Sequence, residues 1–228
     1  MKLLALDTST RAGSVALMAG GRVVSAYTFD VSATHSEMLL PVIDRCLAEA
    51  GWRIADLDLI ACAKGPGGFT GLRIGLATAK GIAFAGGRPL IGVNSLEATA
   101  LPLAFGATPI CPLLDARKRQ VFAALYRPDG RGGLTPERDE VSVAAADWAR
   151  TIAGDCLFVG DGAELYADAI RAAKPDAILV PAALCPARAT VVGWLGERAY
   201  AAGERGLAAN YVRPPDAELN PKFAVKEG

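Results

Sequence analysis

The feature that most restricts the fold is a glycine-rich loop between a short apolar run and a longer amphipathic stretch. Residues Lys64-Gly65-Pro66-Gly67-Gly68-Phe69-Thr70-Gly71 follow the apolar run 57–63 and lead into the stretch 70–85. The glycines permit a tight reversal, and Thr70 is a suitable cap for the helix that follows. A strand that feeds a helix needs a crossover to reach the next strand. We therefore expect a sheet with parallel pairing and helices packed on it.

Three short apolar runs precede this unit. They cover residues 3–6, 14–18 and 22–29, and turn signals at Gly13 and Gly20-Gly21 separate them. Short apolar runs divided by glycine turns are typical of an antiparallel meander. The sheet is therefore expected to be mixed.

The spacing of apolar residues changes after the third run. It becomes three and four, which predicts an amphipathic helix that begins at Thr34, and a further strand is expected at 90–93. Pro41 lies inside this helix and predicts a bend. The apolar stripe comprises positions 38, 39, 42, 43, 46, 47 and 50.

The second part of the chain repeats the opening pattern. An apolar strand again ends in an aspartate turn, Asp115-Ala116-Arg117, as the first strand ends at Asp7. We expect an α/β fold of two similar halves, 1–104 and 105–228. The later elements are predicted as strands at 110–114, 121–126, 134–143, 157–159 and 178–180 and helices at 144–153, 163–173 and 187–202.

Composition narrows the classes of function. The 228 residues are 52% hydrophobic, enough for a substantial core, and 24 basic residues balance 24 acidic ones. A net charge of zero gives no overall attraction to nucleic acid or to anionic membranes. Five scattered cysteines without a CxxC pair argue against a disulfide framework or a zinc knuckle. The early Asp7 and the prolines within 98–114 argue against a signal peptide and a membrane span, so we expect a soluble cytoplasmic protein.

Two segments are candidates for binding phosphate. The glycine-rich loop offers backbone N–H groups at a helix start, with Gly65, Gly67 and Gly68 as the candidates, although it lacks the ending of a Walker loop. The turn Asp7-Thr8-Ser9 offers a carboxylate and hydroxyls that suit magnesium-bound phosphate. Both segments also have a purely structural interpretation as turns.

Other catalytic chemistries lack the residues they need. His35 is the single histidine, so no HExxH pair exists, and no GxSxG elbow is present. We expect no metal site and no cofactor. The basic run Arg117-Lys118-Arg119 is interpreted either as a solvated turn or as an RNA contact.

The two early helices suggest a docking role instead. Gly71, Gly75 and Ala79 form a small-residue strip, and the stripe from Met38 to Cys46 forms an apolar face. Either face can pack on the chain's own sheet or on another protein.

Six segments together resemble the bacterial TsaB (YeaZ) family over nearly the whole chain. They are LLALDTST, HSEMLLPVID, KGPGGFTGLRIGLATAKGIA, GVNSLEA, LLDARKRQVFAALY and NYVRPPDA. The glycine-rich segment is the most specific, and it departs from the family pattern at Gly68, where serine is usual.

This resemblance implies two ribonuclease-H-like halves of the actin/sugar-kinase-like ATPase superfamily. It also implies a non-catalytic subunit that joins TsaD and the ATPase TsaE for threonylcarbamoyl transfer to the adenosine beside the anticodon of tRNAs reading ANN codons. Contact with tRNA is then indirect. An ATP-dependent enzyme and a metallopeptidase of the same superfamily remain the alternatives.

The resemblance further implies a four-helix bundle with TsaD, formed by segments 35–47 and 70–84, and self-association through the same face when TsaD is missing. Helical spacing suggests the contacting side chains. They are His35, Met38, Leu39, Val42, Cys46, Leu72, Gly75, Leu76 and Ala79.

Overall fold

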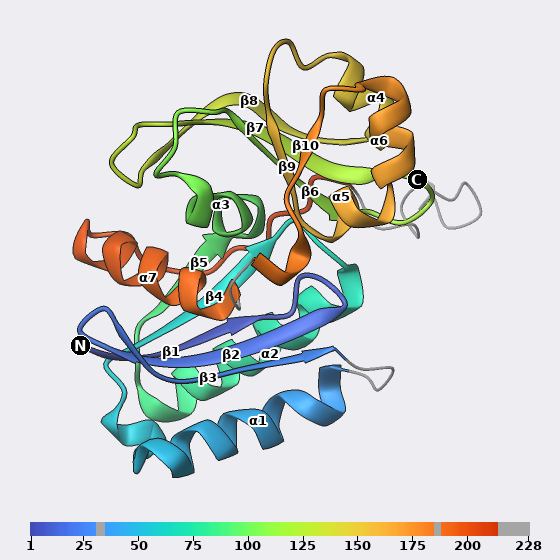
Figure 1. The fold of residues 1–228 in the computed structure, drawn as a ribbon. Helices are drawn as coiled ribbons and strands as arrows, with labels where there is room; N and C mark the ends of the chain where they lie inside the picture. Colours follow the sequence, from blue (N-terminus) through green and yellow to red (C-terminus); the bar gives the residue numbers. More distant parts are fainter. Residues whose placement is uncertain (31–34, 185–187, 214–228) are drawn as a thin grey trace, which may run out of the picture.

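The computed structural model describes residues 1–30, 35–184 and 188–213, which form two mixed sheets, one above the other in Figure 1. The first sheet has the strand order β3-β2-β1-β4-β5. Strands β1 to β3 pair antiparallel, and β4 and β5 are added in parallel beside β1. Its strands are β1 (Lys2–Asp7), β2 (Ala12–Ala19), β3 (Arg22–Asp30), β4 (Leu59–Gly65) and β5 (Leu90–Asn94).

The second sheet repeats this topology in the order β10-β9-β6-β7-β8. Again three strands form an antiparallel meander, and two more join in parallel beside the first of them. The predicted duplication of an α/β unit with mixed sheets is confirmed. The strands are β6 (Ile110–Asp115), β7 (Val121–Pro128), β8 (Leu134–Val143), β9 (Leu157–Val159) and β10 (Ile178–Leu179).

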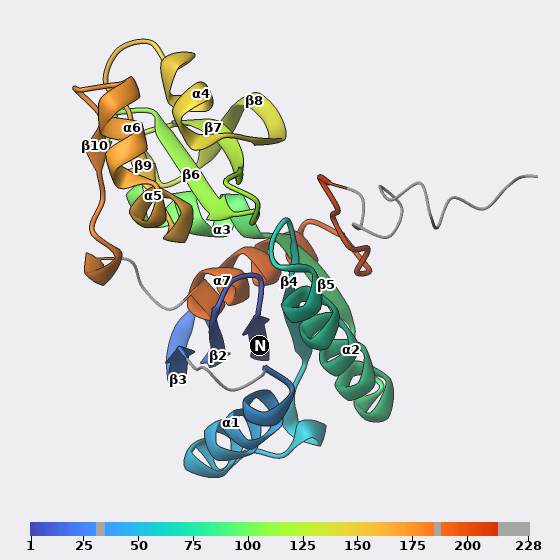
Figure 2. The same cartoon turned by 90° about the vertical axis from the view of Figure 1, so that its right-hand side faces the viewer.

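Helices cover both faces of the first sheet. On one face lie α1 (His35–Ala50) and α2 (Phe69–Gly86), whose apolar sides pack on alternate residues of β1 and β2 such as Leu4 and Leu17. On the other face lie α3 (Ser95–Ala100) and α7 (Arg188–Ala201), as Figures 1 and 2 show. This sheet is therefore buried on both sides.

The second sheet is covered on one face by α4 (Ala145–Arg150), α5 (Asp161–Leu165) and α6 (Ala167–Ala173). Helix α3 serves both sheets, because Ala98 packs with the first and Leu96 with the second. Short 3-10 turns occur at η1 (Ile54–Asp56), η2 (Leu101–Leu103) and η3 (Ala182–Leu184).

Helix α7 comes from the end of the described chain but packs on β1, β2, β4 and β5 of the first sheet. Gly193 permits this close approach, because a Cβ there would lie 3.0 Å from Leu3 Cδ1. The division of the chain into halves 1–104 and 105–228 stays a prediction. Helix α7 belongs to the second of these segments but packs on the first sheet.

Several predicted element ends are corrected. Thr70 does not cap α2, because the helix begins after Gly68, which has extended backbone angles and no side-chain cap. The stretch 163–173 is divided into α5 and α6 at Tyr166, whose φ of −110° is not helical. Helix α1 continues through Pro41, and its predicted cap at Thr34 lies outside the described residues.

Helix α3 was not expected from the sequence. Asn94 caps it, since the Asn94 side-chain oxygen accepts hydrogen bonds from the backbone N–H groups of Leu96 (2.8 Å) and Glu97 (3.0 Å). An asparagine before a short apolar stretch is a usual helix start. This local signal was present and was overlooked.

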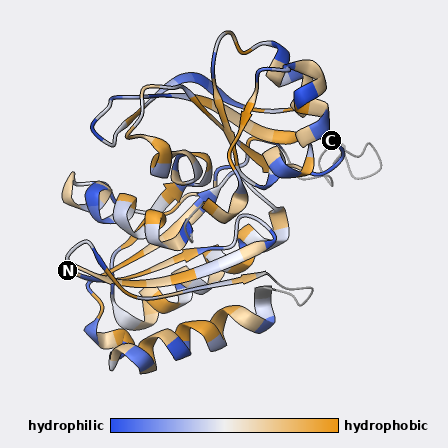
Figure 3. Cartoon of the chain, viewed as in Figure 1, coloured by the Kyte–Doolittle hydropathy of each residue, from blue (hydrophilic) through white to orange (hydrophobic). Residues whose placement is uncertain are grey.

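Hydropathy follows the layers. In Figure 3 the strands of both sheets are largely hydrophobic, whereas α1 alternates between hydrophobic and hydrophilic residues along its length. Within the described ranges, every helix is too short or too polar to span a bilayer. The four described cysteines, Cys46, Cys62, Cys111 and Cys156, are buried and unpaired.

Candidate functional site

The two segments predicted to bind phosphate lie in direct contact. The backbone N–H of Gly68 donates a hydrogen bond of 2.7 Å to the carbonyl oxygen of Ser9. Gly67 packs so closely that a Cβ at this position would overlap the same oxygen and lie 2.8 Å from the Ser9 Cβ. The glycine-rich loop and the turn after β1 therefore form one structural unit, which sequence spacing alone did not establish.

Asp7 is fully buried at the end of β1 and has two partners. Its Oδ1 accepts a hydrogen bond of 2.7 Å from the backbone N–H of Ser9. Its Oδ2 forms an ion pair of 2.8 Å with Nε of Arg188, the first residue of α7. The Arg188 guanidinium also donates to Thr10 Oγ1 and to the carbonyl oxygen of Ala12.

Thr8 joins the same turn to α2. Its hydroxyl donates a hydrogen bond of 2.8 Å to the carbonyl oxygen of Gly71. Gly75 faces this hydroxyl, and a Cβ there would overlap Thr8 Oγ1 and lie 3.4 Å from the Thr8 Cβ. Gly71 and Gly75 of the small-residue strip therefore pack closely against the turn after β1 of the same chain.

These contacts decide whether a nucleotide phosphate fits. The Asp7 carboxylate is neutralised by Arg188, the Gly68 amide is used by Ser9, and the carbonyl oxygen of Asn210 fills the space beside Gly65. Asp7 Oδ2, apart from its ion pair with Arg188, and Ser9 Oγ are buried without a hydrogen-bond partner. The candidates Asp7, Thr8, Ser9, Gly65, Gly67 and Gly68 are thus brought together but closed against one another, and they do not fit a magnesium nucleotide in this conformation.

The second half contains an equivalent aspartate turn. Asp115 Oδ1 accepts a hydrogen bond of 2.9 Å from the backbone N–H of Arg117, as Asp7 does from Ser9. Tyr166 also donates to Asp115 Oδ1, at 3.3 Å. Asp161 lies beside this turn, and burial raises its pKa, an effect that the nearby Arg188 guanidinium partly offsets. Arg188 therefore interacts with carboxylates of both halves.

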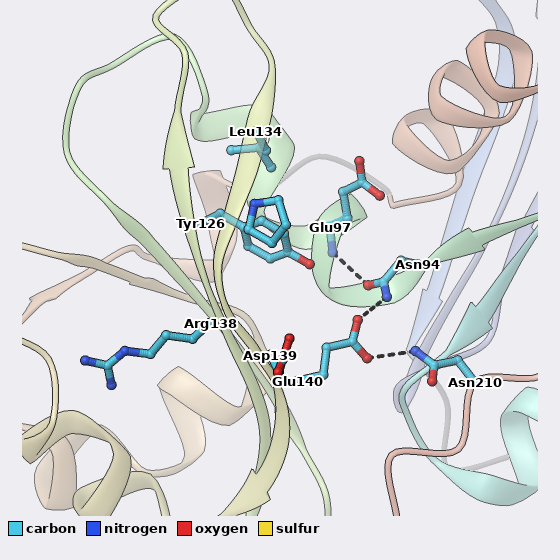
Figure 4. A pocket seen from close by; sticks show the side chains of 9 residues that line it. Asn94, Glu97, Tyr126, Leu134, Arg138, Asp139, Glu140 and Asn210 are labelled. Carbon is cyan, nitrogen blue, oxygen red and sulfur yellow. Dashed lines mark hydrogen bonds between the residues drawn. The ribbon is translucent and has the colours of Figure 1, made fainter. Parts of the chain in front are cut away.

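A cleft of about 520 Å³ is lined by residues of β5, α3, β7 and β8 and by Asn210. Figure 4 shows Glu140 between two amide groups, and its carboxylate accepts hydrogen bonds from Nδ2 of Asn94 and, at 2.7 Å, from Nδ2 of Asn210. Burial is the main cause that raises the pKa of Glu97 and of Tyr126, which line the same space. Arg138 points away from it and donates to Thr151 instead. Sequence analysis missed this cleft because its residues come from distant segments.

Most of the side chains suggested for partner contact are buried in the chain's own core. This corrects the choice made from helical spacing, because the apolar side of each helix is the side that covers the sheet. Met38 is half-buried. His35 is the first residue of α1, and its side chain is not among those that the structure describes. The buried members are Leu39, Val42, Cys46, Leu72, Gly75, Leu76 and Ala79.

The accessible sides of α1 and α2 carry different residues. Leu40 is 53% exposed on α1, and Phe84 is 91% exposed on α2. Ala77 and Gly81 are exposed on the same side of α2, and no heavy atom lies within 4 Å of a Cβ built at Gly81. We call Leu40, Ala77, Gly81 and Phe84 the outer helix face.

A metal centre is not assembled by the described residues, which contain no group of three or more histidine, cysteine, aspartate or glutamate side chains that can hold an ion. Burial raises the pKa of the Cys62 thiol and of Cys111, so these cysteines are held as thiols within the core.

Two halves of this topology, each with an aspartate turn after its first strand, define the class of actin- and sugar-kinase-like ATPase folds. The activator of 2-hydroxyisocaproyl-CoA dehydratase from Clostridium difficile, solved with bound ADPNP, has the same fold with a TM-score of 0.52 at 11% identity over 92% of this chain and all of that chain. A family model described as TsaD, tRNA N6-adenosine threonylcarbamoyltransferase, matches residues 29–215.

More specific relatives align over most of the chain. The tRNA threonylcarbamoyladenosine biosynthesis protein TsaB of Bacillus subtilis is 31% identical over 96% of both chains, and that of Escherichia coli is 32% identical over 80% of this chain and 83% of its own. The solved structure of YeaZ from Pseudomonas aeruginosa superposes with a TM-score of 0.76 at 31% identity, covering 90% of this chain and 95% of its own. The chain belongs to the TsaB (YeaZ) family.

Proposed function

We propose that this chain is a non-catalytic subunit in the biosynthesis of tRNA threonylcarbamoyladenosine. It binds a TsaD-like protein, together with a TsaE-like ATPase, and supports threonylcarbamoyl transfer to the adenosine beside the anticodon of tRNAs reading ANN codons, in the cytoplasm. The observation that carries the proposal is the combination of an exposed outer helix face with a closed phosphate loop.

The outer helix face supports the docking role. Phe84 exposes 91% of its surface on a helix whose other side is packed on the sheet. A large exposed aromatic residue beside small ones on one side of a helix offers an apolar surface that a partner helix can cover. Ala77 and Gly81 are four residues apart on this side, so a partner helix can approach closely there. We infer that α1 and α2 form a four-helix bundle with two helices of the TsaD-like protein.

The same surface supports self-association as part of the proposal. Two copies of this chain present identical outer helix faces, and a two-fold axis brings one face against the other. We infer that the isolated chain forms a homodimer that the TsaD-like protein replaces.

The closed phosphate loop supports the non-catalytic role. Asp7 is the residue that the fold places at the end of the first strand, where a magnesium nucleotide would need its carboxylate, and Arg188 occupies it at 2.8 Å. This argues against the alternative of an ATP-dependent enzyme. That alternative predicts heat of binding in a calorimetric titration of the isolated chain with ATP and magnesium, and we expect none.

Calorimetric titration with the TsaD relative from the same organism tests the docking role. Phe84→Glu and Ala77→Arg each place a charge on the outer helix face, and we expect each to weaken binding at least tenfold. Leu165→Glu is the matched control, because Leu165 is 61% exposed on α5 in the other half. Equal binding by the parent chain and by both outer-face variants contradicts the proposed bundle.

The homodimer is tested with the same proteins. Light scattering of the isolated chain is expected to give the mass of a dimer, and Phe84→Glu is expected to give a monomer. A dimer that persists in Phe84→Glu contradicts self-association through this face.

A further inference from the structure

The hairpin between β6 and β7 has an unusual backbone. Arg117, Lys118 and Arg119 all adopt left-handed conformations, with φ values of 61°, 52° and 62°. Glycine or asparagine adopts such angles far more readily than a long basic residue does. The turn is held by the N–H of Ala116, which donates to the Gln120 carbonyl oxygen at 3.0 Å, and by the Asp115 turn. Strain that the surrounding structure maintains at three charged residues suggests that their side chains have a task.

The strained hairpin continues into a line of aromatic and basic side chains. Arg213 donates a hydrogen bond of 3.2 Å to Oε1 of Gln120, at the base of the hairpin. Two residues earlier, Tyr211 lies with its ring 5.7 Å from that of Phe69, at the start of α2. Figure 2 shows the start of α2 and the described end of the chain beside each other. The hairpin, Arg213, Tyr211 and Phe69 are therefore contiguous.

Arg73 completes this surface. Its guanidinium lies 3.7 Å from the centre of the Phe69 ring. Phe69 and Tyr211 are 37% and 41% exposed, so both aromatic residues reach the surface beside the Arg73 guanidinium. We call residues 117–119, Arg213, Tyr211, Phe69 and Arg73 the basic–aromatic band. The basic–aromatic band and the outer helix face have no residue in common.

Charge on the band is local. It contains five basic side chains, and Arg117 forms an ion pair with Asp115 at 3.5 Å. The chain as a whole has no net charge, so this clustering of basic residues is a local feature. A local excess of arginine and lysine favours a polyanion.

The aromatic rings indicate which polyanion. Unpaired RNA bases stack on aromatic rings and guanidinium planes, while basic side chains contact the phosphates. Paired RNA offers phosphates but no free base faces. We propose that the basic–aromatic band binds a single-stranded segment of RNA, such as a loop; this inference rests on the proposed function, which brings the chain to tRNA.

Fluorescence anisotropy with two labelled RNAs tests the proposal. One is a stem-loop with the sequence of the anticodon arm, and the other is a fully paired duplex of similar length. The full chain is used alone and in its complex with the TsaD relative. Tyr211→Ala is expected to weaken stem-loop binding about tenfold, with little effect on the duplex. Arg119→Gln is expected to weaken both and to reduce the salt slope by about one.

Arg171→Gln is the matched control, since Arg171 is an exposed arginine on α6 with a weak 3.8 Å ion pair. We expect it to leave the affinity for both RNAs unchanged. The proposal is overturned if the parent chain, Tyr211→Ala and Arg119→Gln bind the stem-loop with equal affinity. It is also overturned if Arg171→Gln weakens binding as much as these two variants do, or if the stem-loop binds neither the chain alone nor its complex with the TsaD relative.

A further variant tests whether the left-handed backbone at Arg119 is strained. Arg119→Gly relieves the left-handed conformation, so it is expected to raise the midpoint of urea unfolding while lowering the affinity for the stem-loop. A lower midpoint contradicts the strained turn and overturns the proposal.

Titration of the TsaD relative without RNA separates this inference from the proposed function. If the parent chain does not bind that protein but does bind the stem-loop, the proposed function fails and the RNA site stands. If Arg119→Gln or Tyr211→Ala weakens binding of the TsaD relative, the band is a protein contact and the RNA proposal is overturned.

Discussion

Asp7, at the end of the first strand, is fully buried and ion-paired at 2.8 Å with Arg188, at the start of the last described helix. The pair holds the start of α7 beside the end of β1 and neutralises the Asp7 carboxylate. It therefore connects the architecture of the chain to its proposed non-catalytic role.

The first prediction concerns this ion pair. Arg188→Ala leaves the Asp7 carboxylate buried without its partner, which costs about 3–5 kcal/mol for a buried pair. Urea unfolding measures the loss in free energy of unfolding. Arg171→Ala breaks an exposed pair on α6 and is expected to change that free energy by less than about 1 kcal/mol. Comparable values for the two variants contradict the importance of the pair.

The second prediction compares two neighbouring glycines in the loop. Gly67→Ala forces a Cβ against the Ser9 backbone and is expected to destabilise the chain by about 1–3 kcal/mol. Gly68→Ser places its Cβ 3.7 Å from the Ser9 carbonyl oxygen, an ordinary contact, and is expected to be nearly neutral. Chemical unfolding of both variants tests this difference, and a reversed order shows that the loop packs differently.

The third prediction compares two glycines on α2. Gly75→Ala pushes a methyl group into Thr8 Oγ1, and we expect a loss of about 1–3 kcal/mol. Gly81→Ala meets no atom within 4 Å and improves helix propensity, so a gain of up to about 1 kcal/mol is expected. Both substitutions are made together with Phe84→Glu, which is expected to keep the chain monomeric, and thermal unfolding of these double variants is then free of any contribution from self-association. Stabilisation by both substitutions contradicts the close packing of α2 on β1.

The fourth prediction concerns pH. Burial raises the pKa of Asp161 in the folded chain above its unfolded value of about 3.9. Its protonated form is therefore favoured by folding, and the free energy of unfolding falls as the pH rises from the unfolded pKa through the folded pKa. Asp161→Asn stays neutral and keeps an oxygen that accepts from the N–H groups of Asp115 and Gly162. We expect the variant to be more stable than the parent near neutral pH and to converge with it in acid.

Asp129→Asn is the opposite control for this experiment. Hydrogen bonds from the backbone of Arg131 and Gly133 lower the pKa of Asp129, so its contribution is present above the unfolded pKa and is lost as the pH falls through the folded pKa. Unfolding curves across the acid range are expected to show opposite signs for the two variants. The same sign for both contradicts the assigned environment of Asp161.

The strands and their duplication were predictable because hydrophobic runs and glycine turns are local signals. Strand β8 has the bounds expected from the sequence, and β9 does too. The sequence did not predict which side of α1 and α2 is exposed. Spacing showed that Leu39 and Ala79 share a side with other apolar residues, but that side is the one a sheet requires for its own burial. The informative signal was the residue that breaks the pattern, Phe84.

The partners of the site residues were beyond the reach of sequence analysis. Arg188 meets Asp7, and Asn210 reaches Glu140, only because the end of the chain returns to the first sheet. Such pairings depend on three-dimensional packing, and no local spacing encodes them. The family resemblance predicts the fold and the pathway, whereas the closed loop and the basic–aromatic band depend on contacts between distant segments.

The return of α7 makes the later half an insertion in the earlier one. Everything from β6 to β10 lies along the chain between β5 and the helix that covers the first sheet. A fragment that stops at residue 104 would lack that helix and leave Leu3, Ala5 and Met18 uncovered. The two halves share one topology, but the first sheet needs a helix that follows the second sheet along the chain, so residues 1–104 are not expected to fold stably alone.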